Sequence, residues 1–131
     1  MSAKRVIRNI SIGDLVRYKL PVPGVLSILH RISGAVMFLA LPALLWLFDA
    51  SLRSEVGFGQ ARAIAGHVLV KIVLTGLAWA LLHHLCAGVR YLALDLDLGL
   101  DRMASRRSSW IVFAVSLALT AWAALAVFGV I

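Results

Sequence analysis

The side chain best suited to binding a metal is His84, because it lies in a long apolar stretch where an imidazole is most useful when neutral and coordinating. Steps of four residues from His84 reach Gly76, Ala80 and Gly88, so one helix face would be nearly bare apart from the imidazole. A flat macrocycle such as haem could lie against that face. The same pattern is typical of a small-residue seam for close helix packing, with His84 hydrogen-bonded across it.

A second polar group, formed by Ser27, His30 and Arg31, lies at the start of the first long apolar stretch. Ser27 and Arg31 are four residues apart and therefore share a helix face. Hydroxyl, imidazole and guanidinium groups at this depth supply hydrogen-bond donors for a haem propionate or a quinone carbonyl. The alternative is that Arg31 extends to lipid headgroups, which is the usual role of an interfacial arginine.

Three other polar residues in the apolar stretches fit structural roles better. On a helix, His83 points about 100° away from His84 and lies one turn after the bulky Trp79, so it is a poorer centre for a macrocycle. His67 and Lys71 lie toward the other end of the same stretch, where a histidine can sit in the membrane interface and a lysine can extend into it.

Three apolar segments must position these groups, at about residues 24–49, 63–94 and 110–131, after a tail at 1–23. Each is long enough for a membrane-spanning helix, which needs about 20 apolar residues. We therefore expect an all-α integral membrane protein with three transmembrane helices, built as a single membrane-anchor domain over residues 1–131.

The composition agrees with a membrane protein. Hydrophobic residues make up 62% of the 131 residues, which excludes a water-soluble globular protein and leaves no room for a soluble catalytic domain. The net charge of +7 comes from basic residues beside the apolar segments, which indicates a positive-inside bias instead of nucleic-acid binding. The single cysteine, Cys86, cannot form an intrachain disulfide.

The distribution of basic residues predicts the orientation, and we expect the membrane to be a bacterial cytoplasmic (inner) membrane. The tail carries five lysines and arginines and the second loop three, whereas the first loop carries two. The tail, which lacks the pattern of a cleaved signal peptide, and the second loop should be cytoplasmic, and the C-terminus should lie on the opposite side. His84 would then lie roughly 9 Å deeper than Arg90, if Arg90 marks the interface.

Two motifs give a more specific interpretation. Residues 27–34 read S-I-L-H-R-I-S-G and resemble the S-I-x-H-R-x-[ST]-G signature of the cytochrome b subunit of succinate dehydrogenase, the haem-bearing membrane anchor of complex II. Residues 84–95 read H-L-C-A-G-V-R-Y-L-A-L-D and resemble the second signature of that family, H-x-x-x-G-x-R-H-x-x-x-D. The motifs occur in the family's order, and with the three-helix layout the resemblance covers essentially the whole chain.

The resemblance implies a small anchor that pairs with a second hydrophobic subunit and docks a flavoprotein and an iron–sulfur protein on the cytoplasmic face. It implies that His84 is one axial ligand of haem b and that the second axial ligand comes from the partner anchor. It also implies that His30 and Arg31 approach the haem propionates.

For the quinone, the resemblance implies a pocket lined by Ser27, Ile28 and Arg31, with Asp95 supporting it less directly. The chain departs from the family in two places. Tyr91 replaces the usual histidine after the arginine of the second motif. Residues 17–23 read R-Y-K-L-P-V-P where many members carry Arg-Pro-x-Ser-Pro-His, so contacts of that segment cannot be transferred.

The expected function is membrane anchoring with quinone reduction, in which electrons from succinate pass through the iron–sulfur subunit to ubiquinone, with haem b beside the route, in the respiratory chain and citric acid cycle. The sequence has no flavin motif, cysteine cluster or dicarboxylate-binding loop, so the chain alone should not oxidise succinate. The alternatives are the anchor of a quinol:fumarate reductase, with reverse electron flow and menaquinone, and a structural helix bundle without haem.

Overall fold

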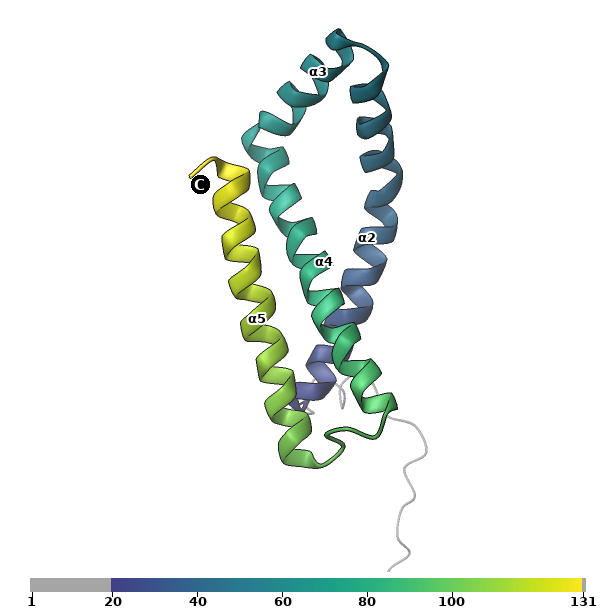
Figure 1. The fold of residues 1–131 in the computed structure, drawn as a ribbon, viewed down its shortest axis with the longest axis vertical. Coiled ribbons are helices and arrows are strands. Elements are labelled where there is room, and N and C mark those ends of the chain that lie inside the picture. Colours follow the sequence, from purple (N-terminus) through teal and green to yellow (C-terminus); the bar gives the residue numbers. More distant parts are fainter. Residues whose placement is uncertain (1–19, 131) are drawn as a thin grey trace, which may run out of the picture.

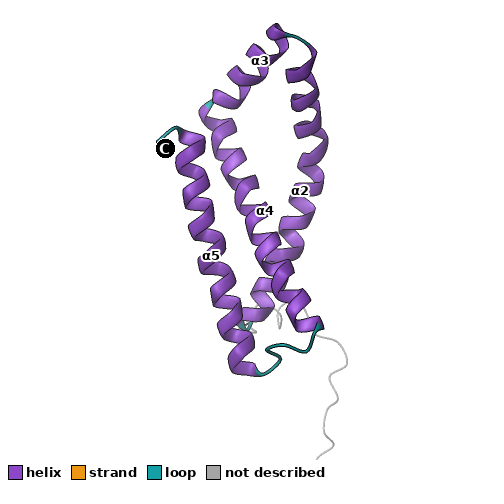
Figure 2. Ribbon diagram, in the orientation of Figure 1, coloured by secondary structure: helices purple, strands orange, loops and turns teal. Residues whose placement is uncertain are grey.

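The computed structural model describes residues 20–130. This part of the chain contains no strand and four helices: α2 (Val22–Arg53), α3 (Glu55–Gly66), α4 (Val68–Asp95) and α5 (Arg102–Phe128) (Figures 1 and 2). The three long helices α2, α4 and α5 are apolar and long enough to cross a membrane. The all-α class with three candidate membrane spans is therefore confirmed.

The first helix is longer than the expected 24–49. α2 begins at Val22, with Pro23 in its first turn, where a missing backbone N–H leaves no helical hydrogen bond unmade. It continues through Pro42 and ends at Arg53, because Ser54 takes an extended conformation. The expected tail therefore overlaps the helix by two residues, and its five basic residues lie outside the described part of the chain.

The expected second helix, 63–94, is wrong as one element, because the structure divides it at His67. His67 has an extended backbone (φ −67°, ψ 135°), and its Nδ1 accepts a hydrogen bond from the N–H of Leu69, 3.3 Å away. The side chain thereby caps α4 at its first turn. The residues before it belong to α3, a short helix that connects the end of α2 to the start of α4 (Figure 1).

The third helix begins earlier in the chain than the expected 110–131. α5 starts at Arg102, because Asp101 caps it: the Asp101 carboxylate accepts hydrogen bonds of 2.9 and 3.0 Å from two N–H groups of the first turn. The three arginines assigned to the second loop are therefore in the first turns of α5. The helix ends at Phe128, followed by Gly129 in the left-handed conformation at φ 74°. Residue 131 lies outside the described part.

The helices pack most closely at one end of the molecule. α4 runs between α2 and α5, and α2 crosses α4 near the beginning of α2 and separates from it toward α3 (Figure 1). The buried apolar cluster, Leu26, Ala87 and Val112, takes one residue from each long helix. Elsewhere the long helices expose large apolar side chains, as expected of surfaces that contact lipid.

Candidate functional site

Two histidines meet where α2 crosses α4. The rings of His30 and His84 are stacked, with centroids 4.0 Å apart and planes 15° from parallel. Each histidine is followed four residues later by a glycine, and each glycine lies near the opposite histidine. A Cβ atom on Gly34 would be 2.8 Å from Cε1 of His84, and one on Gly88 would be 3.9 Å from Nε2 of His30. Gly34 therefore creates the space that the His84 ring occupies.

Hydrogen bonds define the tautomer of His84. Its Nδ1 lies 2.9 Å from the carbonyl oxygen of His30 and 3.2 Å from Oγ of Ser33, which itself donates to that carbonyl at 2.8 Å. A carbonyl oxygen only accepts hydrogen bonds, so Nδ1 carries the proton. Nε2 then holds the free lone pair, and no hydrogen bond to it is present within residues 20–130.

This arrangement fits a haem ligand. Histidines that bind metals generally donate their other ring N–H to a carbonyl or carboxylate, which fixes the ring and makes the ligating nitrogen more basic. No group of three or more histidine, cysteine, aspartate or glutamate residues that could hold a metal ion occurs in the described chain. A single oriented imidazole suits the axial position of a haem iron better than a chelated ion.

The small-residue face of α4 could serve close helix packing or contact with a macrocycle, and the structure shows a different environment at each end of this face. Gly88 lies against His30 of α2, and Ala80 is 2% exposed, so this part of the face packs against protein. Gly76 is exposed, and a Cβ there would meet nothing within 4 Å. Close packing therefore explains the part of the face from Ala80 to Gly88, and only the part near Gly76 is not covered by this chain.

His83 faces α5, whereas its neighbour His84 faces α2. The His83 side chain is fully buried and stacks between Trp79, at 5.2 Å, and Phe113, at 5.5 Å between ring centroids. Neither ring nitrogen has a hydrogen-bond partner among residues 20–130. The two adjacent histidines thus occupy different environments, and only His84 is held by polar contacts.

Arg90 connects α4 to α5. It is 7% exposed, donates from Nε to Oγ of Ser108 at 2.8 Å, and donates from Nη2 to Oγ and the carbonyl oxygen of Ser105 at 2.9 and 3.2 Å. Sequence reasoning missed this role. The available signal was the pair of serines three residues apart near the start of the third apolar segment.

Tyr91, the residue that departs from the second motif, lies between Arg90 and His30. Its ring centroid is 5.1 Å from that of His30, and the guanidinium carbon of Arg90 lies 5.5 Å from the Tyr91 ring. The hydroxyl is buried and has no hydrogen-bond partner in the described part of the chain. Contacts therefore run from α5 through Arg90, Tyr91 and His30 to His84.

The four residues expected at the quinone lie at the same end of the molecule but do not contact one another through hydrogen bonds in the described chain. Ser27 is half-buried on α2, whereas Ile28 and Arg31 are exposed on the same helix. Asp95 is the exposed last residue of α4. Ile28 and Arg31 therefore face away from the rest of this chain.

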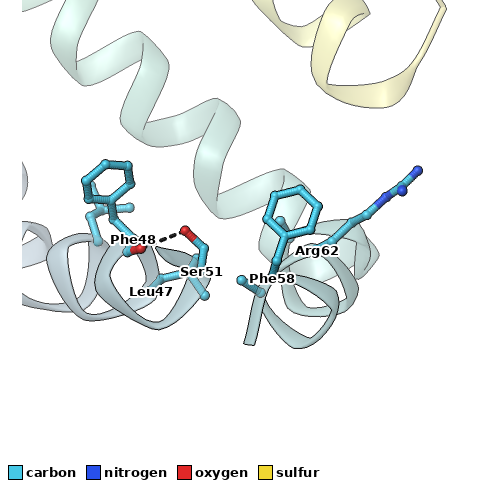
Figure 3. A pocket seen from close by; sticks show the side chains of 8 residues that line it. Leu47, Phe48, Ser51, Phe58 and Arg62 are labelled. Atoms are coloured by element: carbon cyan, nitrogen blue, oxygen red, sulfur yellow. Dashed lines mark hydrogen bonds between the residues drawn. The ribbon is translucent and has the colours of Figure 1, made fainter. Parts of the chain in front are cut away.

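A cavity of about 400 Å³ lies at the opposite end, between the end of α2 and α3. Figure 3 shows Phe48, Ser51 and Phe58 at this cavity, with the Arg62 guanidinium extending away from them. The Ser51 hydroxyl donates to the carbonyl oxygen of Phe48 at 2.6 Å. No residue expected to bind haem or quinone lines this cavity.

Comparison with known proteins identifies the family. Residues 7–123 match the family described as the succinate dehydrogenase/fumarate reductase transmembrane subunit. The chain is 35% identical to the succinate dehydrogenase cytochrome b556 subunit of Coxiella burnetii, over 88% of this chain and 90% of the relative. It is 34% identical to the corresponding subunit of Rickettsia felis, over 79% and 80% of the two chains.

The subunit of the same name from Paracoccus denitrificans is 34% identical, over 78% of each chain. The family match, residues 7–123, spans α2, α4, most of α5 and both histidine-containing motifs. The chain therefore belongs to the family of succinate dehydrogenase cytochrome b subunits, which are transmembrane anchors.

Proposed function

We propose that this protein binds haem b through His84 and contributes to a site at which ubiquinone is reduced with electrons from succinate. The observation that carries the proposal is the hydrogen bond from Nδ1 of His84 to the carbonyl oxygen of His30, which leaves Nε2 available to iron. The names of the curated relatives, all cytochrome b556 subunits, support a haem protein.

Haem, when bound, supplies a one-electron redox centre within the membrane. His84 would hold the haem iron through Nε2, together with a ligand from a second hydrophobic anchor subunit. His30 and Arg31 would hold the propionates by hydrogen bonding, and Arg31 would also attract them by its charge. Gly34 keeps the His84 ring close to α2, so that the ligand is positioned by the helix crossing before haem binds.

The quinone site uses residues on the outward face of α2. The Ser27 hydroxyl and the Arg31 guanidinium donate hydrogen bonds to a quinone carbonyl, and Arg31 stabilises the negative charge that develops during reduction. Ile28 supplies an apolar contact, and Asp95 supports the pocket from the end of α4. Because Ile28 and Arg31 are exposed in this chain, a neighbouring subunit completes the pocket.

The iron–sulfur and flavoprotein subunits dock on the cytoplasmic face, which in this proposal is the side of the membrane at which α2 and α5 begin. The three arginines in the first turns of α5 support this orientation, and the C-terminal end of α5 then faces the opposite side. Succinate is oxidised in the flavoprotein, so this chain is non-catalytic alone. The names of the curated relatives favour succinate oxidation over fumarate reduction as the physiological direction.

Purification of the complex through a tag on this chain tests the proposal. We expect a second anchor, an iron–sulfur protein and a flavoprotein to copurify, with a b-type spectrum and succinate:ubiquinone reductase turnover. A complex without haem would support a structural bundle. Faster quinol:fumarate than succinate:quinone turnover, with menaquinone preferred, would reverse the proposed direction.

A further inference from the structure

A second cavity, of about 730 Å³, lies at the end of the molecule where α2 and α5 begin. Its walls come from the residues around the start of α2, from Leu100, and from the first turns of α5. None of the residues proposed to bind haem or quinone lines it. Its volume is within the range of about 300–1,000 Å³ that is typical of small-molecule sites.

Two arginines give this cavity a positive charge. Arg102 and Arg106 line it from α5 and, being four residues apart, share a helix face. They lie in the first turns of α5, where the helix dipole adds a partial positive charge. Within residues 20–130 the one ion pair is Arg53–Asp49, so neither arginine has a carboxylate partner there, and the nearby Asp101 carboxylate caps the helix.

A third guanidinium lies directly behind the wall of the cavity. Ser105 lines the cavity and accepts hydrogen bonds from Nη2 of Arg90 through its hydroxyl and its carbonyl oxygen, at 2.9 and 3.2 Å. The other hydrogen-bond partner of Arg90 in the described chain, Ser108, is also neutral. The buried charge of Arg90 therefore adds to the attraction of an anion toward this wall.

The remaining wall is apolar and includes Pro21, Pro23, Leu100 and Met103. Leu100 is 61% and Met103 is 80% exposed, so their side chains are accessible. A free inorganic anion would leave this apolar wall without contacts. A phospholipid would use both parts of the cavity, since its phosphate would face the arginines and its glycerol and first methylene groups would contact the apolar wall.

We propose that this cavity binds the headgroup of an anionic phospholipid, with the phosphate between Arg102 and Arg106. The cavity lies at the end of three candidate membrane spans, which is the depth of lipid headgroups. Basic pockets between transmembrane helices at this depth are known to select anionic lipids. The site is independent of haem and quinone and would attach the start of α5 to the start of α2 through a lipid.

Native mass spectrometry of the purified complex, with phosphatidylglycerol or phosphatidylcholine added, tests the proposal. We expect the wild-type complex to retain one phosphatidylglycerol that the Arg102→Gln/Arg106→Gln complex binds roughly 30-fold more weakly, since each arginine contributes about fivefold. Phosphatidylcholine should be retained equally weakly by both complexes. Arg62→Gln is the matched control, because Arg62 lines the cavity at the opposite end, and it should retain the lipid as the wild type does.

Equal retention of phosphatidylglycerol by the wild-type complex and the double variant would overturn the proposal. Displacement of the lipid by millimolar inorganic phosphate alone would also overturn it, because the apolar wall would then have no role. Loss of the iron–sulfur subunit from the double variant, with lipid retention unchanged, would assign the arginines to an acidic protein surface instead.

Discussion

The two ends of the membrane helices differ in how far their polar side chains are buried and hydrogen-bonded. Where α2 crosses α4, polar side chains are enclosed: His84 is bonded to α2, and Arg90, which is 7% exposed, is bonded to serines of α5. At the α3 end, the ion pair between Arg53 and Asp49 is exposed, and α2 and α4 are separated (Figure 1).

This difference shows which end of the helices holds its side chains in defined positions. An exposed ion pair within one helix contributes little, because water screens its charges, whereas hydrogen bonds from a buried charge contribute about 1.5–3 kcal/mol. The crossing end therefore fixes the positions of its side chains, as a cofactor ligand requires. The α3 end has weaker constraints, which suits a region that only connects two membrane helices.

The largest expected effect on stability comes from filling the space beside Gly34, where α2 crosses α4. Gly34→Leu places a side chain where a Cβ alone would be 2.8 Å from His84, so we expect it to displace the imidazole and to lower the free energy of unfolding by about 3 kcal/mol. Gly59→Leu on α3, where nothing lies within 4 Å, should not lower it, because leucine favours a helix interior over glycine by about 0.5–1 kcal/mol. Thermal unfolding of the purified complexes measures both, and equal effects would remove the difference between the two ends.

Two serines on α2 provide the next comparison. Ser27→Ala should lower quinone reduction about 10- to 150-fold, because a donor to the developing anion is lost, while succinate oxidation with an artificial acceptor is unchanged. Ser51→Ala, at the α3 end, removes only a hydroxyl bonded to the carbonyl of Phe48 and should leave both activities unchanged. Normal quinone kinetics in an assembled Ser27→Ala complex would move the quinone pocket elsewhere.

Arg90 and Arg62 test whether burial of a charge decides its contribution. Arg90→Lys loses the planar donor arrangement that reaches Ser105 and Ser108, so we expect about 2 kcal/mol of destabilisation in urea unfolding. Arg62→Lys should cost less than about 0.5 kcal/mol, because Arg62 is exposed. An Arg90→Lys complex as stable as the wild type would mean that the serine contacts do not hold α5 to α4.

Substitutions of Tyr91 should have the smallest effect on stability. Two of them distinguish the contribution of the ring from that of the hydroxyl. Tyr91→Phe removes a buried hydroxyl that has no partner in the chain as the structure describes it, and should change stability by less than about 0.5 kcal/mol. Tyr91→Leu loses the contact with the His30 ring and should cost about 1 kcal/mol. If Tyr91→Phe instead altered the haem spectrum, the hydroxyl would be acting on the site directly.

The sequence predicted the three apolar helices because lipid exposure requires long uncharged segments, and hydropathy alone reveals these. It did not predict the break at His67 or the start of α5 at Arg102, because a cap depends on one side chain bonding to nearby N–H groups within otherwise continuous sequence. Hydropathy therefore locates membrane segments, whereas their ends depend on local hydrogen bonds.

For the site, the sequence placed His30 and His84 at a similar depth, since consecutive spans are antiparallel. It could not show that their rings stack or that Ser33 also contacts His84, because these depend on how each helix is rotated about its axis. The burial of Arg90 was missed for a similar reason: its serine partners lie on α5, which hydropathy placed farther along the chain.

The most direct test of the central claim compares two adjacent histidines in the purified complex by reduced-minus-oxidised difference spectroscopy. His84→Leu should remove or rearrange the low-spin b-type spectrum, because Nε2 of His84 is the proposed iron ligand. His83→Leu should leave the spectrum nearly intact, because His83 is enclosed between Trp79 and Phe113 on the α5 side. An unchanged spectrum in His84→Leu, with loss of the spectrum in His83→Leu, would contradict the assignment.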